Sequence, residues 1–148
     1  DLSRRADWKL QVANPPAVIT CTDVMPREHP ELVVTYMKAM IKVGRWANEH
    51  KRAAAVLLDR QTFYRDAEDT YQGIKDVDMV PNLSPQNLAC VATGKDFMVK
   101  NGYIKNDFDV QKWAAPEFLE MAAKQLIEEQ WKKKSGEKLP EGTHLRLG

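Results

Sequence analysis

One run of β-branched residues, AVITCTDV at residues 17–24, stands in a chain whose other patterns are helical. Such residues favour a strand because they pack well on a pleated surface. The Pro15-Pro16 pair before the run excludes a helix there. A buried strand must pair its backbone N–H and C=O groups with a neighbour. If the run is a strand, we therefore expect its sheet to be completed by further sequence, by another chain or by assembly of several copies. The alternative is that the run does not form a strand.

Helical periodicity covers most of the remaining sequence. Residues 30–50 carry the clearest amphipathic pattern, and Pro30 and Glu31 suit its first turn. We expect its apolar face to be buried, namely Leu32, Val33, Tyr36, Met37, Met40, Ile41 and Gly44. Further helices are predicted over residues 52–58, 64–75, 84–101 and 110–113, and a last amphipathic helix runs from Pro116 towards Gly136.

The predicted helix ends carry recognisable signals. Ser84 and Asp109 suit the N-cap position, and Gly102 suits a left-handed stop after residue 101. Gly94 lies inside the predicted helix at 84–101, where glycine costs about 1 kcal/mol relative to alanine. We therefore expect a close packing contact at Gly94.

Composition indicates a globular protein of ordinary polarity. The chain has 148 residues, of which 43% are hydrophobic and 29% charged, and a formal net charge of +1. This charge gives no field for binding nucleic acid, and no apolar run reaches the roughly 18 residues of a membrane helix. Residues 137–148 lack periodicity and are predicted to form a flexible tail. A start at Asp1 without Met suggests a processed or truncated chain.

The residues that most often carry chemistry are scattered. His29, His50 and His144 have no ligand spacing with one another or with Cys21 and Cys90. A zinc site needs three or four convergent ligands, and a nucleophilic cysteine needs a base. We therefore predict no metal site, no cofactor and no catalytic residue, with both cysteines as buried thiols, although a disulfide between them stays open.

Four short phrases then follow one another in a distinctive order. They are HPELV at residues 29–33, GRWANEH at 44–50, NGYI at 101–104 and WAAPEFL at 113–119. Over residues 18–126, this order resembles the carboxyl-terminal part of the periplasmic solute-binding-protein fold. The similarity is to the nitrate, sulfonate and taurine branch, and closest to its aryl sulfinate desulfinase members. The resemblance implies a two-lobed α/β parent of the type II class. Residues 1–136 would be a mainly helical portion with one strand.

The resemblance also implies a function. The expected role is that of an ABC-transporter solute-binding protein, which closes two lobes on a small anionic organic ligand. Its partners would be the upstream lobe or another chain that completes the sheet, and a membrane permease. Such a protein would be periplasmic or lipid-anchored. The first alternative is a cytoplasmic desulfinase-like hydrolase, whose Cys, His and Arg have no counterpart in this segment. The second alternative is a helical interaction subunit.

Only two residues are candidates for ligand contact. Thr20 and Thr22 fall on one face of the predicted strand, near the expected hinge between the lobes. Their hydroxyl groups are able to donate hydrogen bonds to an anionic oxygen.

Overall fold

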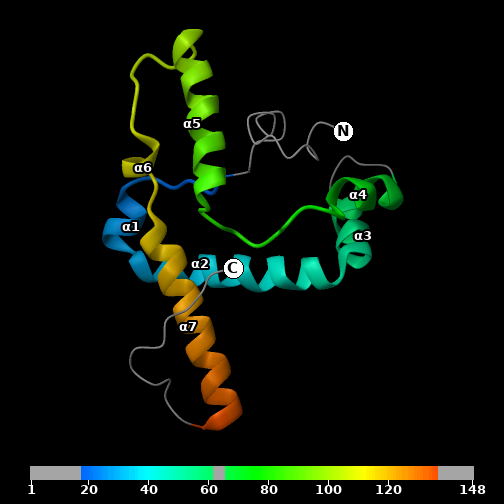
Figure 1. Cartoon of the computed structure of the whole chain (residues 1–148). Coiled ribbons are helices and arrows are strands. Elements are labelled where there is room, and N and C mark those ends of the chain that lie inside the picture. Colours follow the sequence, from blue (N-terminus) through cyan, green and yellow to red (C-terminus); the bar gives the residue numbers. More distant parts are fainter. Residues whose placement is uncertain (1–17, 62–65, 137–148) are drawn as a thin grey trace. The chain divides into compact units, whose positions relative to one another are not determined.

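The computed structural model describes residues 18–61 and 66–136. These residues form helices and no strand (Figure 1). The helices are α1 (Val24–Glu28), α2 (Pro30–Glu49), α3 (Lys51–Gln61), α4 (Ala67–Ile74), α5 (Pro85–Lys100), α6 (Val110–Trp113) and α7 (Pro116–Ser135). The chain divides into two compact units. One unit contains α1, α5 and α6, and the other contains α2, α3, α4 and α7 from Phe118 onward.

The strand predicted at residues 17–24 is wrong for the part that the structure describes. Residues 18–22 are exposed and irregular, and Val24 begins α1. The C=O of Thr22 accepts the N–H of Met25 at 3.1 Å, which turns the chain into that helix. β-Branched composition alone does not make a strand, because a strand needs a neighbour to bond to. The described residues contain no neighbouring strand. They are helical, and they do not show the α/β class that the family resemblance implies for a longer, two-lobed protein.

The helix predictions are confirmed to within a few residues. Ser84 caps α5, and its Oγ accepts the N–H of Asn87 at 3.2 Å. Asp109 caps α6, and its carboxylate accepts the N–H of Gln111 at 2.9 Å. Gly102 follows α5 with a φ of 74°, a left-handed conformation that glycine adopts without a Cβ clash.

The core of the second unit lies where α2 packs against α7. Its buried side chains are Val34, Ile41, Ala122, Ala123 and Leu126, with Met37, Val80, Phe118 and Leu119 packed around them. The two alanines let the helices approach closely, because they add no bulk between the backbones. Burial of each large aliphatic side chain contributes roughly 1.5–3 kcal/mol.

Part of the predicted apolar face of α2 is not in this core. Leu32 and Tyr36 are each 51% exposed, whereas Ile41 is 3% exposed. The α2 helix therefore has two apolar sides, of which α7 covers one.

The connector after α4 is fixed to α2 by Asn48. Its Oδ1 accepts the backbone N–H of Met79 at 3.0 Å, and its Nδ2 donates to Asp78 Oδ1 at 2.7 Å. Lys51 adds to this network by donating to Asn48 Oδ1 at 2.9 Å and to the carbonyl of Val77. A backbone segment without secondary structure thereby gains partners for its polar groups.

The α3 and α4 helices form a hairpin in the same unit. Arg52 of α3 donates to Glu68 Oε2 of α4 at 2.6 Å, and its guanidinium lies 4.0 Å from the centre of the Tyr71 ring. The pKa of Glu68 lies below its ordinary value because Gln72 and Arg52 donate to its carboxylate. Ala54 of α3 is buried. The hairpin thus combines a small apolar contact with an exposed ion pair.

In the first unit, α5 is tied to the loop before α6. Lys95 Nζ lies 2.6 Å from both Asp96 Oδ1 and Asp107 Oδ1, and Cys90 and Val110 are buried. The close contact predicted at Gly94 is wrong, because a Cβ there would meet nothing within 4 Å.

Candidate functional site

The two threonines predicted to contact ligand lie on the exposed segment before α1. Thr20 and Thr22 are both exposed, in residues that form no strand. Alternation along a strand was the reason to place them on one face, and that reason does not hold here. The groove described below is lined by other residues and does not include Thr20 or Thr22.

The cysteines and the two described histidines have separate surroundings. Cys90 is buried as predicted, whereas Cys21 is exposed rather than buried in a strand, and neither forms a disulfide. His29 lies next to Glu31, with Nδ1 3.7 Å from its carboxylate. His50 ends α2, where its Nδ1 lies 3.0 Å from the carbonyl oxygen of Trp46. Within residues 18–61 and 66–136, no three His, Cys, Asp or Glu side chains converge on a point where a metal ion fits. His144 lies outside these residues.

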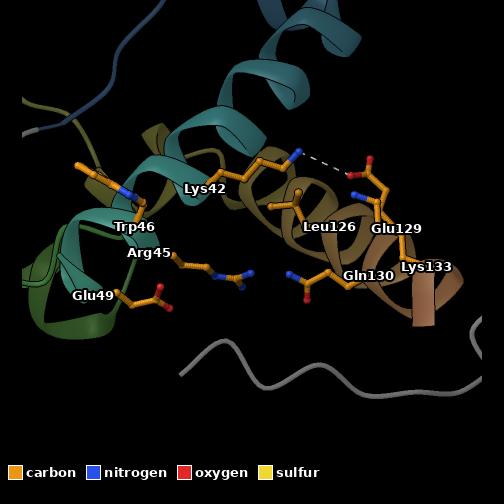
Figure 2. Close-up of a pocket in the computed structure, with 8 residues that line it drawn as sticks. All are labelled: Lys42, Arg45, Trp46, Glu49, Leu126, Glu129, Gln130 and Lys133. Atoms are coloured by element: carbon orange, nitrogen blue, oxygen red, sulfur yellow. Dashed lines mark ion pairs between the residues drawn. The ribbon is translucent and has the colours of Figure 1, made fainter. Parts of the chain in front are cut away.

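Among the described residues, a groove lies between α2 and the second half of α7 (Figure 2). Its volume is about 330 Å³. It is lined by Lys42, Arg45, Trp46, Glu49, Leu126, Glu129, Gln130 and Lys133. Leu126 at its floor is buried in the core of the unit. The sequence pattern places Lys42, Arg45 and Glu49 on a polar helix face, but the groove exists only because α7 packs alongside.

Glu129 is the best-neutralised charge in this groove. Its carboxylate is bound by Lys38 and lies 3.8 Å from Lys42 Nζ. Lys38 also donates to Gln125 Oε1 at 3.2 Å. The hydrogen bond from Lys38 and the positive charges of Lys38, Lys42 and Lys133 hold the pKa of Glu129 below its ordinary value. This ion pair connects α2 to α7 across the rim of the groove.

Two other cations of the groove have no such partner. Among the described residues, Arg45 and Lys133 have no carboxylate within 4 Å. Figure 2 shows Arg45 and Gln130 extending toward each other from opposite helices. Trp46 stacks on His50, with ring centres 5.4 Å apart, and forms one end of the groove.

This arrangement is suited to weak binding of a small anion and not to covalent chemistry. Arg45 and Lys133 offer donors, but Glu49 opposes them, and exposed charges are screened by water and salt. Among the residues that the structure describes, those lining the groove carry no thiol, hydroxyl or imidazole group. These lining residues therefore do not provide a nucleophile together with its base.

Comparison with known proteins gives one consistent result. The chain is 26% identical over 113 residues to a 2'-hydroxybiphenyl-2-sulfinate desulfinase of Rhodococcus erythropolis and to one of Rhodococcus qingshengii. A third desulfinase with the same name, from R. erythropolis strain XP, matches equally. The match covers 70% of this chain but 29% of each relative, so the chain spans less than a third of their length. The similarity is distant and partial, and it agrees with the desulfinase resemblance of the sequence phrases.

Two further comparisons found no counterpart. No protein-family model matches the chain, and no solved structure matches it.

Among the described helices, none combines the length and the apolar character needed to cross a membrane.

Proposed function

We propose that this chain is a helical portion of a desulfinase-like hydrolase that acts on an aryl sulfinate. In that reaction, water and the sulfinate give the arene and hydrogen sulfite, so the carbon–sulfur bond is replaced by a carbon–hydrogen bond. The observation that supports the proposal is the match to three desulfinases over 113 residues, 70% of the chain. The phrases at residues 44–50 and 113–119 support the same relationship.

The chemistry itself is proposed to lie in a part of the protein outside these helices. Cys90 is buried, and no histidine contacts Cys21 among the described residues. A thiolate mechanism needs a base within hydrogen-bond reach. The helices would then support the catalytic part. Thr20 and Thr22 stay our candidates for contact with the sulfinate oxygens.

A solute-binding protein of the nitrate, sulfonate and taurine class is the competing proposal. It rests on the order of the four sequence phrases. It requires the same kind of small anionic ligand and an upstream lobe, but no turnover. A membrane permease would be its further partner.

The experiment uses the whole product of the gene that encodes this chain. It is incubated with 2'-hydroxybiphenyl-2-sulfinate, and sulfite and 2-hydroxybiphenyl are measured. Release of both in equal amounts supports the desulfinase proposal. A rise in Tm with sulfonates or nitrate, without turnover of the sulfinate, would instead support the solute-binding proposal.

The two threonines are tested in the same assay. Thr20→Val and Thr22→Val remove a hydroxyl group and keep a β-branched shape. Loss of one hydrogen bond to a charged oxygen corresponds to roughly 1.5–3 kcal/mol, which is at least a tenfold rise in KM. An unchanged KM in both variants would remove them from the binding site.

A further inference from the structure

One side of α2 carries a row of uncovered apolar residues. Leu32, Tyr36, Ala39, Val43 and Trp46 follow one another at intervals of four, three, four and three residues. All five are exposed, and Val43 is 59% exposed. Single exposed apolar residues are ordinary, whereas a contiguous row marks a surface that packs against something. We call these five residues the α2 stripe.

The stripe lies on a different side of α2 from the residues that the fold already buries. Val34 and Ile41 belong to the core shared with α7, and Gly44 lies under the connector. Because each residue of an α-helix turns the chain by about 100°, Val43 and Ile41 point to nearly opposite sides of α2. The contact with α7 therefore leaves the stripe without a role in this unit.

The tryptophans of the described residues show the same lack of cover. Trp46 is 39% exposed, Trp113 is 50% exposed and Trp131 is 40% exposed. Tryptophan is on average highly buried in folded proteins. Among the described residues, the buried apolar positions hold smaller side chains, of which Ile41 and Leu126 are the largest. Large apolar side chains without cover on α2, α6 and α7 are typical of a portion of a larger core.

The length of the relatives indicates what covers the stripe. The match takes up 70% of this chain and 29% of each desulfinase, so more than two thirds of such a protein lies outside the matched region. We propose that, in the whole gene product, the α2 stripe packs against an apolar face of the remaining polypeptide. This inference rests on the proposed function, in which the chain is one portion of a longer hydrolase.

Covalent linkage favours this occupant over a second copy of the chain. A linked part of the same polypeptide acts at an effective concentration of roughly millimolar, which a separate molecule has to reach in solution in order to compete. The stripe carries no charged side chain, so its counterpart is expected to be apolar as well. Lys42 and Glu49 are exposed along one flank of the stripe, where they suit the polar rim of such a contact.

The first test measures how fast an introduced thiol reacts with a maleimide. Val43→Cys is made in the whole gene product and in the 148-residue chain, and peptide mass spectrometry follows the modification at position 43. The reaction is expected to be roughly tenfold slower, or more, in the whole gene product, because a covered side chain reacts only after local opening. Lys124→Cys, at an exposed polar position of α7, is the control and should react equally fast in both proteins.

Three results of this test would overturn the proposal. Equally fast modification at position 43 in both proteins would show that the stripe stays open. Slow modification in the 148-residue chain at every protein concentration would show that the chain covers its own stripe. Slow modification that becomes faster when this chain is diluted would show that a second copy covers it.

The second test places a charge on the stripe. Val43→Glu should lower the Tm of the whole gene product by about 5 °C or more, because a buried carboxylate without a partner is costly. The same change should lower the Tm of the 148-residue chain by about 1 °C or less, since Val43 is 59% exposed there. Val43→Thr, which keeps the shape of the side chain, should show the same order with smaller shifts. Equal shifts in the two proteins would contradict the proposal.

Sulfite release from the same gene product separates this inference from the proposed function. Sulfite release together with an open stripe would remove this inference and leave the desulfinase proposal in place. A covered stripe without sulfite release would remove the desulfinase proposal, and the contact between α2 and the remaining polypeptide would stand.

Discussion

Gly44 of α2 and Met79 of the connector lie in direct backbone contact. A Cβ on Gly44 would meet the carbonyl carbon of Met79 at 2.8 Å and the Cα of Val80 at 2.8 Å. Real Cβ atoms do not approach backbone so closely, and these atoms are part of a segment held by Asn48. Glycine is therefore required here by space, and not by backbone conformation.

Gly44→Ala is expected to destabilise the chain. Alanine is the better helix former by about 1 kcal/mol, but the overlap with the connector costs roughly 1–3 kcal/mol or more. Gly94→Ala is the matched control, because a Cβ there meets nothing within 4 Å. It is expected to raise the free energy of unfolding by about 0.5–1 kcal/mol. Urea denaturation of both variants tests this, and equal effects would show that the connector does not lie on Gly44.

Asn48→Ala is expected to release the connector. It removes the acceptor of the Met79 N–H and the donor to Asp78. Leaving such groups unpaired costs about 1–3 kcal/mol. Hydrogen exchange at the Met79 amide should become faster in this variant. Gln61→Ala, at the exposed end of α3, is the control and should change stability by no more than about 0.5 kcal/mol. Unchanged exchange at Met79 would contradict the bond.

The ion pair between Lys38 and Glu129 predicts a dependence of stability on pH. The pKa of Glu129 is lowered by the Lys38 hydrogen bond, so the ionised carboxylate favours the folded state. This contribution is present above the unfolded-state pKa of glutamate. It is lost as the pH falls through the lower pKa of the folded chain.

Glu129→Gln should therefore flatten the loss of stability at acidic pH. The neighbouring Glu128→Gln, with no ion-pair partner among the described residues, serves as the control and should leave the profile unchanged. Thermal denaturation measured across the acidic range gives the result. Identical profiles for the wild type and Glu129→Gln would show that the ion pair is absent in solution.

The contact between α2 and α7 depends on small side chains. Ala122 is 0% exposed and Ala123 is 1% exposed. Ala122→Leu adds three carbon atoms to a filled interface and is expected to cost roughly 1–3 kcal/mol. Lys124→Leu, at an exposed position of the same helix, is the control for the added bulk. Equal stability of the two variants would mean that α7 does not pack on α2.

Local signals in the sequence were sufficient to predict where most of the described helices begin and end. Pro30, Ser84, Asp109 and Gly102 act within one turn of the chain, so their effects are readable without a tertiary structure. The helix α1 was missed because Val24 belongs to a β-branched run. The predicted strand there failed because pairing depends on a neighbour that local composition does not specify.

The groove could not be predicted from sequence for a related reason. Arg45 and Lys133 are far apart in the chain, and each belongs to an ordinary charged helix face. Only the packing of α7 on α2 brings these two side chains to the same groove. The exposure of Leu32 and Tyr36 was missed likewise, because periodicity identifies an apolar face but does not say what covers it.

The most direct test of the proposed relationship is sulfite release from 2'-hydroxybiphenyl-2-sulfinate by the whole product of the gene. The measurement follows sulfite and 2-hydroxybiphenyl together over time, with the described helical chain alone as the control. We predict equal release of both products by the whole gene product and none by the helical chain. A correctly folded gene product that releases no sulfite, or a helical chain that releases it alone, would contradict the proposal.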